Sequence, residues 1–276
     1  MEKANIQPLG TLSGPLLVFG GSYSNLQALE ALKKAAEAKA IPPENIICTG
    51  DVVGYCADPE ATVQTVMDWG IRVVAGNVEL QLRSGAEDCG CDFNTGGRCD
   101  VFSRQWYPFA QKALSETSLT WMKTLPEALQ FTYGGQSATV LHGSWFETAG
   151  YVFQSTPWSE KLRHFSAAES QLILAGHCGL PFAHQYEHYS WLNAGVIGMP
   201  ANDGTPRVWY LTLETSATGW QHQFHSLEYD FREAAQRMHQ RRLPQAYAKT
   251  LVTGLWDNCE ILPEEETLLQ GQPIVF

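Results

Sequence analysis

The 276-residue sequence lacks long apolar runs, an excess of positive charge and internal repeats. No run approaches the about 18 apolar residues that a membrane-spanning helix needs. The N-terminal region holds only the four-residue run Leu16–Phe19, so we expect neither a membrane anchor nor a secretory signal. Eighteen Lys and Arg against 29 Asp and Glu leave a net charge of −11. A surface of that sign repels nucleic-acid backbones and anionic membranes, which argues against general binding to either.

The composition is otherwise that of a folded chain. Apolar residues make up 44% and charged residues 17% of the sequence, which excludes wholesale disorder. The chain has seven cysteines, an odd number that cannot all pair, and it is large enough to fold without stabilising disulfide bonds. We therefore expect reduced thiols and a cytoplasmic location.

Apolar runs and amphipathic segments alternate along the first 75 residues. Strands are expected at 16–19, 45–48 and 72–75, and helices from Asn25 and from Pro59 to about Trp69. Residues 1–13 are mostly polar and predict a loose arm. The alternation predicts an α/β fold with parallel strands, whose functional loops lie at the carboxyl ends of the strands.

The regular pattern lapses after residue 84. Residues 85–100 are rich in Gly and Cys and predict an irregular insertion. Gly134-Gly135 predicts a hairpin turn, and antiparallel strands and C-terminal helices are expected beyond it. We predict one compact unit, with a main domain over residues 1–215 and a C-terminal strand and helical extension over 216–276 packed on it.

Four short motifs pair a glycine with a metal-ligating residue type at or just after predicted strands. They are Gly50-Asp51, Gly76-Asn77, His142-Gly143 and Gly176-His177. One carboxylate, one amide oxygen and two imidazoles form a mixed set that suits Zn, Mn or Fe better than Mg or Ca. Taken singly, each could be an unrelated loop residue, but four at strand ends favour a common site.

These motifs resemble those of the calcineurin-like metallophosphoesterases, most closely the small bacterial phosphodiesterase and diadenosine-tetraphosphatase-like branch. The resemblance covers about Leu16 to Leu213 and includes residues 193–200, which are similar to the Asn-Pro-Gly-Ser-Val-Gly-x-Pro loop of that branch. It implies a four-layer α/β/β/α sandwich and hydrolysis of phosphomonoesters or phosphodiesters, including nucleotide-like ones.

The sequence departs from the family pattern at four positions. Gly21 and Tyr23 stand where the family has the Asp and His of its first motif, and Gly179 stands at its final His. Val78 replaces the general-acid residue that follows Gly-Asn. The first three of these positions all ligate the same one of the family's two metals.

The ligands of the other metal are complete, namely Asp51, Asn77, His142 and His177. We therefore expect one divalent transition-metal ion there, with the same four residues serving in catalysis. The alternative is a hydrogen-bonded cluster without metal.

A phosphate-binding role is expected where the first metal would lie in the family. The turn of Gly21, Ser22, Ser24 and Asn25 opens a helix, so its backbone N–H groups could hold an oxyanion. The Tyr23 hydroxyl could donate to a phosphate oxygen and so contribute to catalysis.

The insertion contributes Cys89, Cys91 and Cys99, whose spacing is not that of a standard zinc ribbon. A structural zinc site, a disulfide or redox pair, and plain loop cysteines all remain open. Cys56 and Cys178 adjoin the ligand motifs and should border the site. His164, His184 and His188 could line the same cleft or be ordinary hydrogen-bonded histidines.

Three functions are consistent with this sequence. The first is a phosphoesterase with a single metal ion acting on a small phosphorylated substrate. The second is an inactive relative that serves as a ligand-binding or regulatory module. The third is a metal enzyme of different chemistry that uses Cys56, Cys178 and Tyr23.

Overall fold

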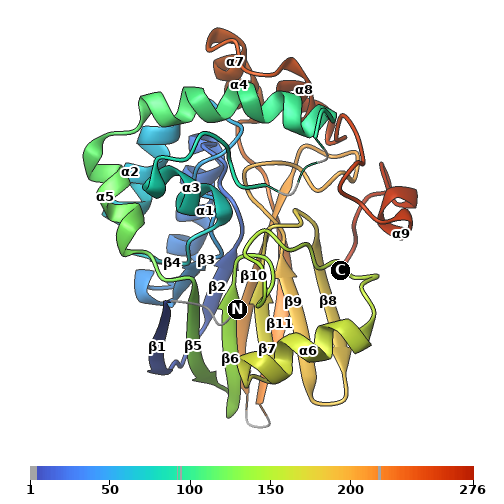
Figure 1. Ribbon diagram of the computed structural model, residues 1–276. Coiled ribbons are helices and arrows are strands. Elements are labelled where there is room, and N and C mark those ends of the chain that lie inside the picture. The colour runs from blue at the N-terminus through green and yellow to red at the C-terminus, as the bar shows by residue number, and fades with distance from the viewer. Residues whose placement is uncertain (1–4, 92, 94, 217–218) are drawn as a thin grey trace.

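A computed structural model of the chain describes residues 5–91, 93, 95–216 and 219–276. Two mixed β-sheets lie face to face and helices cover their outer surfaces (Figure 1). None of the helices in these residues combines the length and the apolarity that crossing a bilayer requires.

The first sheet has the strand order β1-β5-β6-β7-β9-β8 and the second has the order β11-β10-β2-β3-β4. The strands of the first sheet are β1 (Ile6–Thr11), β5 (Ala128–Tyr133), β6 (Gln136–Leu141), β7 (Leu172–Ala175), β8 (Pro181–Tyr186) and β9 (Tyr189–Ala194). Those of the second are β2 (Leu16–Phe19), β3 (Ile46–Cys48), β4 (Arg72–Val73), β10 (Val208–Ser216) and β11 (Gly219–Leu227). The helices are α1 (Leu26–Ala38), α2 (Pro59–Trp69), α3 (Asn77–Ser84), α4 (Arg98–Ala113), α5 (Glu116–Thr124), α6 (Trp158–Ala168), α7 (Phe231–Gln240), α8 (Gln245–Thr253) and α9 (Glu264–Leu268), with a 3-10 turn at Pro43–Asn45.

Three apolar cores separate the layers. Strand β2 contributes to two of these cores, one on each face of its sheet. Leu17 and Phe19 pack toward α1 and α2, while Leu16 and Val18 pack toward the other sheet. This alternation is what a strand buried on both faces requires. A third core lies between the first sheet and α6, around Phe165 and Trp191. The predicted four-layer α/β/β/α arrangement is confirmed.

The loose arm predicted for residues 1–13 is wrong for residues 6–11, and residues 1–4 lie outside the described part of the chain. Ile6–Thr11 forms β1, which pairs in parallel with β5 at the edge of the first sheet. The pairing partner is more than 100 residues away in the sequence, so a local polar pattern could not reveal it.

The C-terminal residues join the same architecture. Strand β11 pairs with β10 along its whole length and forms the edge of the second sheet. On α7, Arg237 makes a two-pronged ion pair with Asp58, at the N-terminus of α2, with N–O distances of 2.7 and 2.5 Å. This contact ties the C-terminal helices to the loop that follows Asp51.

Candidate metal centre

Four loops at the carboxyl ends of neighbouring strands bring the predicted ligands together. Asp51 follows β3, Asn77 begins α3 after β4, His142 follows β6 and His177 follows β7. All four side chains are buried. The site therefore forms where the two sheets present their strand ends to one another.

The ligand atoms converge on one point. Nε2 of His142 lies 3.0 Å from Oδ1 of Asn77, 3.0 Å from Nδ1 of His177 and 3.3 Å from Oδ2 of Asp51. One ligand atom each from Asp51, His142 and His177 falls within 4.8 Å of the others, which is the spacing of a metal-binding group.

The hydrogen-bonding partners outside the cluster show which atoms face inward. Nδ1 of His142 lies 2.7 Å from the carbonyl oxygen of Thr49, which only accepts, so Nδ1 of the neutral ring carries the hydrogen. The Asn77 amide donates to the Cys89 carbonyl oxygen at 2.9 Å and to Cys91 Sγ at 3.3 Å, so its oxygen points into the cluster. A buried carboxylate, an amide oxygen and an imidazole lone pair thus face one another. Such a set of acceptors fits a cation.

Electrostatics favour the metal-binding protonation states of Asp51 and His177. Burial by itself would raise the pKa of Asp51, but His142 and His177 hold that pKa below its usual value. Burial and the neighbouring His142 lower the pKa of His177 to about 3, so this ring is neutral at pH 7. A neutral imidazole and an ionised carboxylate are the forms that bind metal. Burial by itself would lower the pKa of His142, but the Asp51 carboxylate raises it above the usual value, so this ring must lose a proton when an ion binds.

The backbone at two ligands is held in an uncommon conformation. Asp51 has φ of +55° and His177 has φ of +62°, in the left-handed region that most side chains avoid. Gly50 must be glycine, because a Cβ there would lie 2.6 Å from the Gly76 nitrogen. Strain of this kind is kept where surrounding contacts fix a functional geometry.

Glu79 is a residue of the site that our sequence analysis missed. Its fully buried carboxylate accepts hydrogen bonds from the backbone N–H groups of Asp51 at 2.8 Å, Gly76 at 2.9 Å and Val53 at 3.2 Å. Burial, together with the Asp51 charge, raises the pKa of Glu79 to about 7. The sequence signal was its place three residues after Gly76, where a helix commonly carries a carboxylate that caps the preceding turn.

The two departures from the family's first motif, Gly21 and Tyr23, lie against one another. A Cβ added at Gly21 would overlap the ring of Tyr23, and Cβ atoms at Gly54 and Gly198 would meet Tyr23 at 2.8 and 2.5 Å. The ring thus lies in a slot walled by three glycines and is almost completely buried. The departures at positions 21 and 23 are therefore one structural change, in which a tyrosine occupies the room that a side chain at 21 would need.

The turn predicted to bind phosphate uses its polar groups within the protein. The N–H groups of Tyr23, Ser24 and Asn25 donate to the carbonyl oxygens of Asp51, Val52 and Ser22. Ser22 Oγ donates to the Val52 carbonyl oxygen, and Ser24 Oγ accepts from the Gly54 N–H.

The Asn25 side chain caps α1 through the Ala28 N–H. These residues are completely buried, so they shape the loop that carries Tyr23, and oxyanion binding by Gly21, Ser22, Ser24 and Asn25 stays a prediction.

Two of the insertion cysteines reach the site. Cys89 and Cys91 bring their sulfur atoms within 2.6 Å, and both contact the Asn77 amide. Cys99 lies apart, beside the Asn258 side chain. The three cysteines are not part of the metal-binding group found among the described residues, and a structural zinc site at them stays a prediction. A redox pair at Cys89 and Cys91 stays a prediction.

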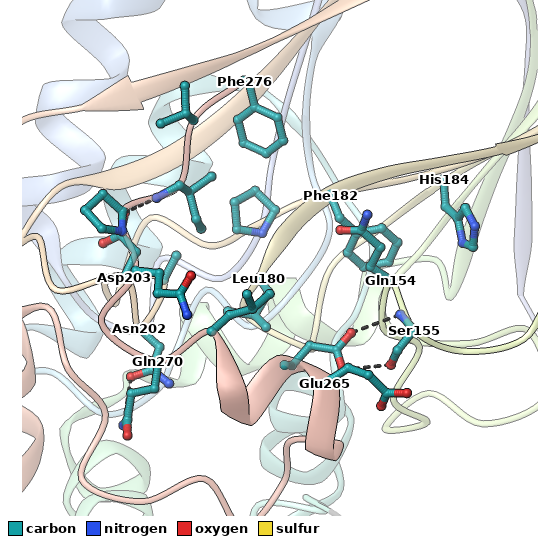
Figure 2. Close-up of a pocket in the computed structure, with 18 residues that line it drawn as sticks. Gln154, Ser155, Leu180, Phe182, His184, Asn202, Asp203, Glu265, Gln270 and Phe276 are labelled. Carbon is teal, nitrogen blue, oxygen red and sulfur yellow. Dashed lines mark hydrogen bonds between the residues drawn. The ribbon is translucent and has the colours of Figure 1, made fainter.

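A larger cavity lies away from this centre, between β8 and the C-terminal segment. Its volume is about 710 Å³, and Figure 2 shows His184 on its wall, so this histidine does not line the metal centre. Trp158 Nε1 donates to His184 Nε2 at 2.8 Å, which leaves the hydrogen of a neutral ring on Nδ1. That nitrogen lies 2.7 Å from Nζ of the buried Lys161, an arrangement that favours an uncharged amine. Burial correspondingly lowers the pKa of Lys161 to about 8.

Comparisons with known proteins agree with this geometry. Residues 19–217 match the sequence model of the calcineurin-like phosphoesterase superfamily domain. The uncharacterized protein MJ0912 of Methanocaldococcus jannaschii is 22% identical over 254 residues, which span 87% of this chain and 98% of that protein.

Two solved structures share the fold. A metallophosphoesterase from Sphaerobacter thermophilus superposes with a TM-score of 0.68 at 22% identity, covering 88% of this chain and 100% of that one. The hypothetical protein PH1004 from Pyrococcus horikoshii superposes with a TM-score of 0.73 at 18% identity, covering 88% and 99%. With the family match over most of its length and the ligand cluster at the expected strand ends, the chain belongs to the calcineurin-like phosphoesterase superfamily.

Proposed function

We propose that the protein is a phosphoesterase that works with a single divalent transition-metal ion, held by Asp51, Asn77, His142 and His177. The observation that carries this proposal is the contrast between two halves of one site. Four acceptor-bearing side chains converge in one half, while Gly21 and Tyr23 stand where the family's first motif supplies ligands to the other. A second ion would find no carboxylate or imidazole at positions 21 and 23.

The ion would supply positive charge that polarises a phosphate oxygen and acidifies a coordinated water. The residues of the chain hold and orient the reacting groups around it. Asp51 contributes the negative charge, and the neutral rings of His142 and His177 contribute lone pairs. Burial and the Asp51 charge raise the pKa of Tyr23, so its hydroxyl stays protonated at neutral pH and can donate to a phosphate oxygen.

The site has no titratable group at position 78, where the family has its general acid. Val78 is buried and apolar, and only its backbone N–H approaches Asp51, at 3.3 Å from Oδ1. A missing general acid costs about 10²–10⁴-fold in rate. We therefore expect slow hydrolysis and a preference for esters whose alcohol is a good leaving group.

A non-catalytic binding module is the second candidate, and Val78 is the observation that favours it. Such a protein would bind the ion and a phosphorylated ligand through the same residues without turnover. The two candidates differ only in whether product forms, so a hydrolysis assay separates them.

The test begins with metal content. Protein purified without chelators should contain one transition-metal ion per chain by mass spectrometry. The His177→Ala variant should lose both the ion and hydrolysis of nitrophenyl phosphomonoesters and phosphodiesters. His188→Ala is the matched control, because His188 is exposed and lies outside the cluster.

Three results would overturn the single-ion phosphoesterase. The first is a metal content of two ions per chain. The second is the absence of a bound ion after the protein has been incubated with Zn, Mn and Fe in turn. The third is hydrolysis that survives in His177→Ala. One bound ion without hydrolysis of any ester would support the binding module instead.

A further inference from the structure

A second, small cavity adjoins the ligand cluster and is not needed to hold the ion. Asp51 and His177 are among the residues that line it, and its volume is about 80 Å³. The aromatic rings of Tyr23, Tyr55 and Tyr247 form one continuous wall. Ring centroids lie 4.7 Å apart between Tyr23 and Tyr55, and 4.8 Å apart between Tyr55 and Tyr247. Rings in mutual contact make a pre-formed surface for an apolar group.

Apolar side chains also contribute to the rest of the lining. Tyr151 stacks on the His177 ring with centroids 4.4 Å apart, and Val196 and Met199 complete this part of the lining. The hydroxyl groups of the cavity wall stay uncharged at neutral pH, since burial raises the pKa of Tyr55 and Tyr247 above the usual tyrosine value.

The charge of the lining limits what can bind. In the described part of the chain no lysine or arginine lines this cavity, whereas Asp51 and Asp257 both do. Arg98 does not line the cavity but is the ion-pair partner of Asp257, which does. A substrate with further phosphate groups would place each added negative charge beside carboxylates with no cation to balance it.

The size of the cavity sets a second limit. Its volume is roughly half that of the engineered 150 Å³ cavity that binds benzene. A short alkyl group fits, and a single ring fits if part of it extends through the mouth. A nucleoside does not fit, because a base and a ribose each need about as much room as the whole cavity.

We propose that this cavity binds the organic group of the substrate, and that the group is small, uncharged and apolar, no larger than one ring. The proposal rests on the proposed function, since it places the phosphate at the metal centre beside Asp51 and His177. It predicts simple alkyl or aryl phosphate esters as the substrate class and disfavours nucleotides and polyphosphates.

Binding of two non-hydrolysable phosphonates, with a nucleotide as the comparison, tests this directly. Isothermal titration of the metal-loaded protein would compare methylphosphonate, phenylphosphonate and adenosine monophosphate. Phenylphosphonate should bind about tenfold or more tightly than methylphosphonate, because the ring is removed from water. Adenosine monophosphate should bind no more tightly than methylphosphonate.

A cavity-filling variant supplies the structural control. Ile261 lines the cavity and is only partly buried, so Ile261→Trp should fill the space with little effect on folding. It should abolish the advantage of the phenyl group while binding methylphosphonate as wild type does. Val252→Trp is the matched control, since Val252 is 42% exposed on α8 and does not line the cavity. Its affinities should equal those of the wild type.

The outcomes separate the two proposals. The first measurement is titration of the wild-type protein with the metal alone. If the protein binds no transition-metal ion, both the single-ion phosphoesterase and the cavity assignment are overturned. Normal ion binding with equal affinity for methyl- and phenylphosphonate would overturn only the cavity assignment. Tighter binding of adenosine monophosphate than of phenylphosphonate, or an intact phenyl preference in Ile261→Trp, would do the same.

Discussion

Replacing Glu79 by glutamine should weaken metal binding without unfolding the protein, although Glu79 touches no ligand atom. Its carboxylate joins the Asp51 turn to Gly76 and Val53 through three backbone N–H groups. In Glu79→Gln one oxygen can still accept from Asp51 and Gly76. The amide nitrogen then faces the Val53 N–H across the 3.2 Å at which the second carboxylate oxygen now accepts, and two donors repel.

Two contributions to the free energy of unfolding oppose each other in this variant. The unsatisfied Val53 N–H costs about 1–3 kcal/mol. The buried Glu79 carboxyl, whose pKa is raised from 4.5 to about 7, destabilises the folded wild type at pH 7, and replacing it removes up to about 3 kcal/mol of this destabilisation. Net stability should therefore change little. The Asp51 turn loses part of its support, however, and loss of such an outer hydrogen-bonding partner lowers metal affinity by about 10–100-fold.

The measurement pairs metal titration calorimetry with chemical denaturation. Because the folded state binds more protons than the unfolded state between pH 4.5 and about 7, Glu79 destabilises the wild type as pH rises through this range, and the variant should lose that slope. Glu266→Gln is the matched control, since Glu266 is also buried and accepts from a backbone N–H, that of Ser155, away from the centre. Unchanged metal affinity in Glu79→Gln would refute the positioning role.

Three further substitutions test other parts of the structure. Gly21→Ala should cost about 1–3 kcal/mol of stability through overlap with the Tyr23 ring, and a double-mutant cycle by denaturation should show that Tyr23→Ala removes this cost. Burial lowers the pKa of Lys161 from 10.5 to about 8, so between these two pH values the unfolded state binds more protons at this residue than the folded state. The free energy of unfolding should therefore rise with pH across this range, by up to about 3 kcal/mol. That slope should vanish in Lys161→Met but persist in the exposed control Lys249→Met, in denaturation midpoints measured across this range. Treatment with peroxide should form a disulfide between Cys89 and Cys91, and intact-mass measurement should then show the loss of two hydrogens from the wild type. Cys89→Ser should prevent this loss. An unchanged wild-type mass would reject the redox pair.

Helices and strands could be predicted from the sequence where their signals lie in neighbouring residues. The run at 16–19 indicated a doubly buried strand, and the helix from Pro59 to Trp69 lies where Pro at its first position and Gly70 after its end place it. Strand β1 was missed because its stability comes from pairing with β5, and neither its composition nor its periodicity records that partner.

The ligand motifs were also local, since each of Asp51, Asn77, His142 and His177 stands beside a glycine at or after a strand end. The chain order of these motifs was enough to predict that they meet. Their protonation and direction were not accessible, because these depend on the Thr49 and Cys89 carbonyl oxygens, which reach the site from other loops.

The sequence by itself determined the chemistry available to this protein: one carboxylate, one amide and two imidazoles at strand ends, with glycine and tyrosine where the family carries further ligands. Only the tertiary structure decided that the Tyr23 ring takes the space beside Gly21, that Glu79 supports the Asp51 turn and that His184 belongs to another cavity. The physical reason is that residue type sets what an atom can donate, accept or bind. Packing between segments far apart in the chain sets where that atom points and what it meets.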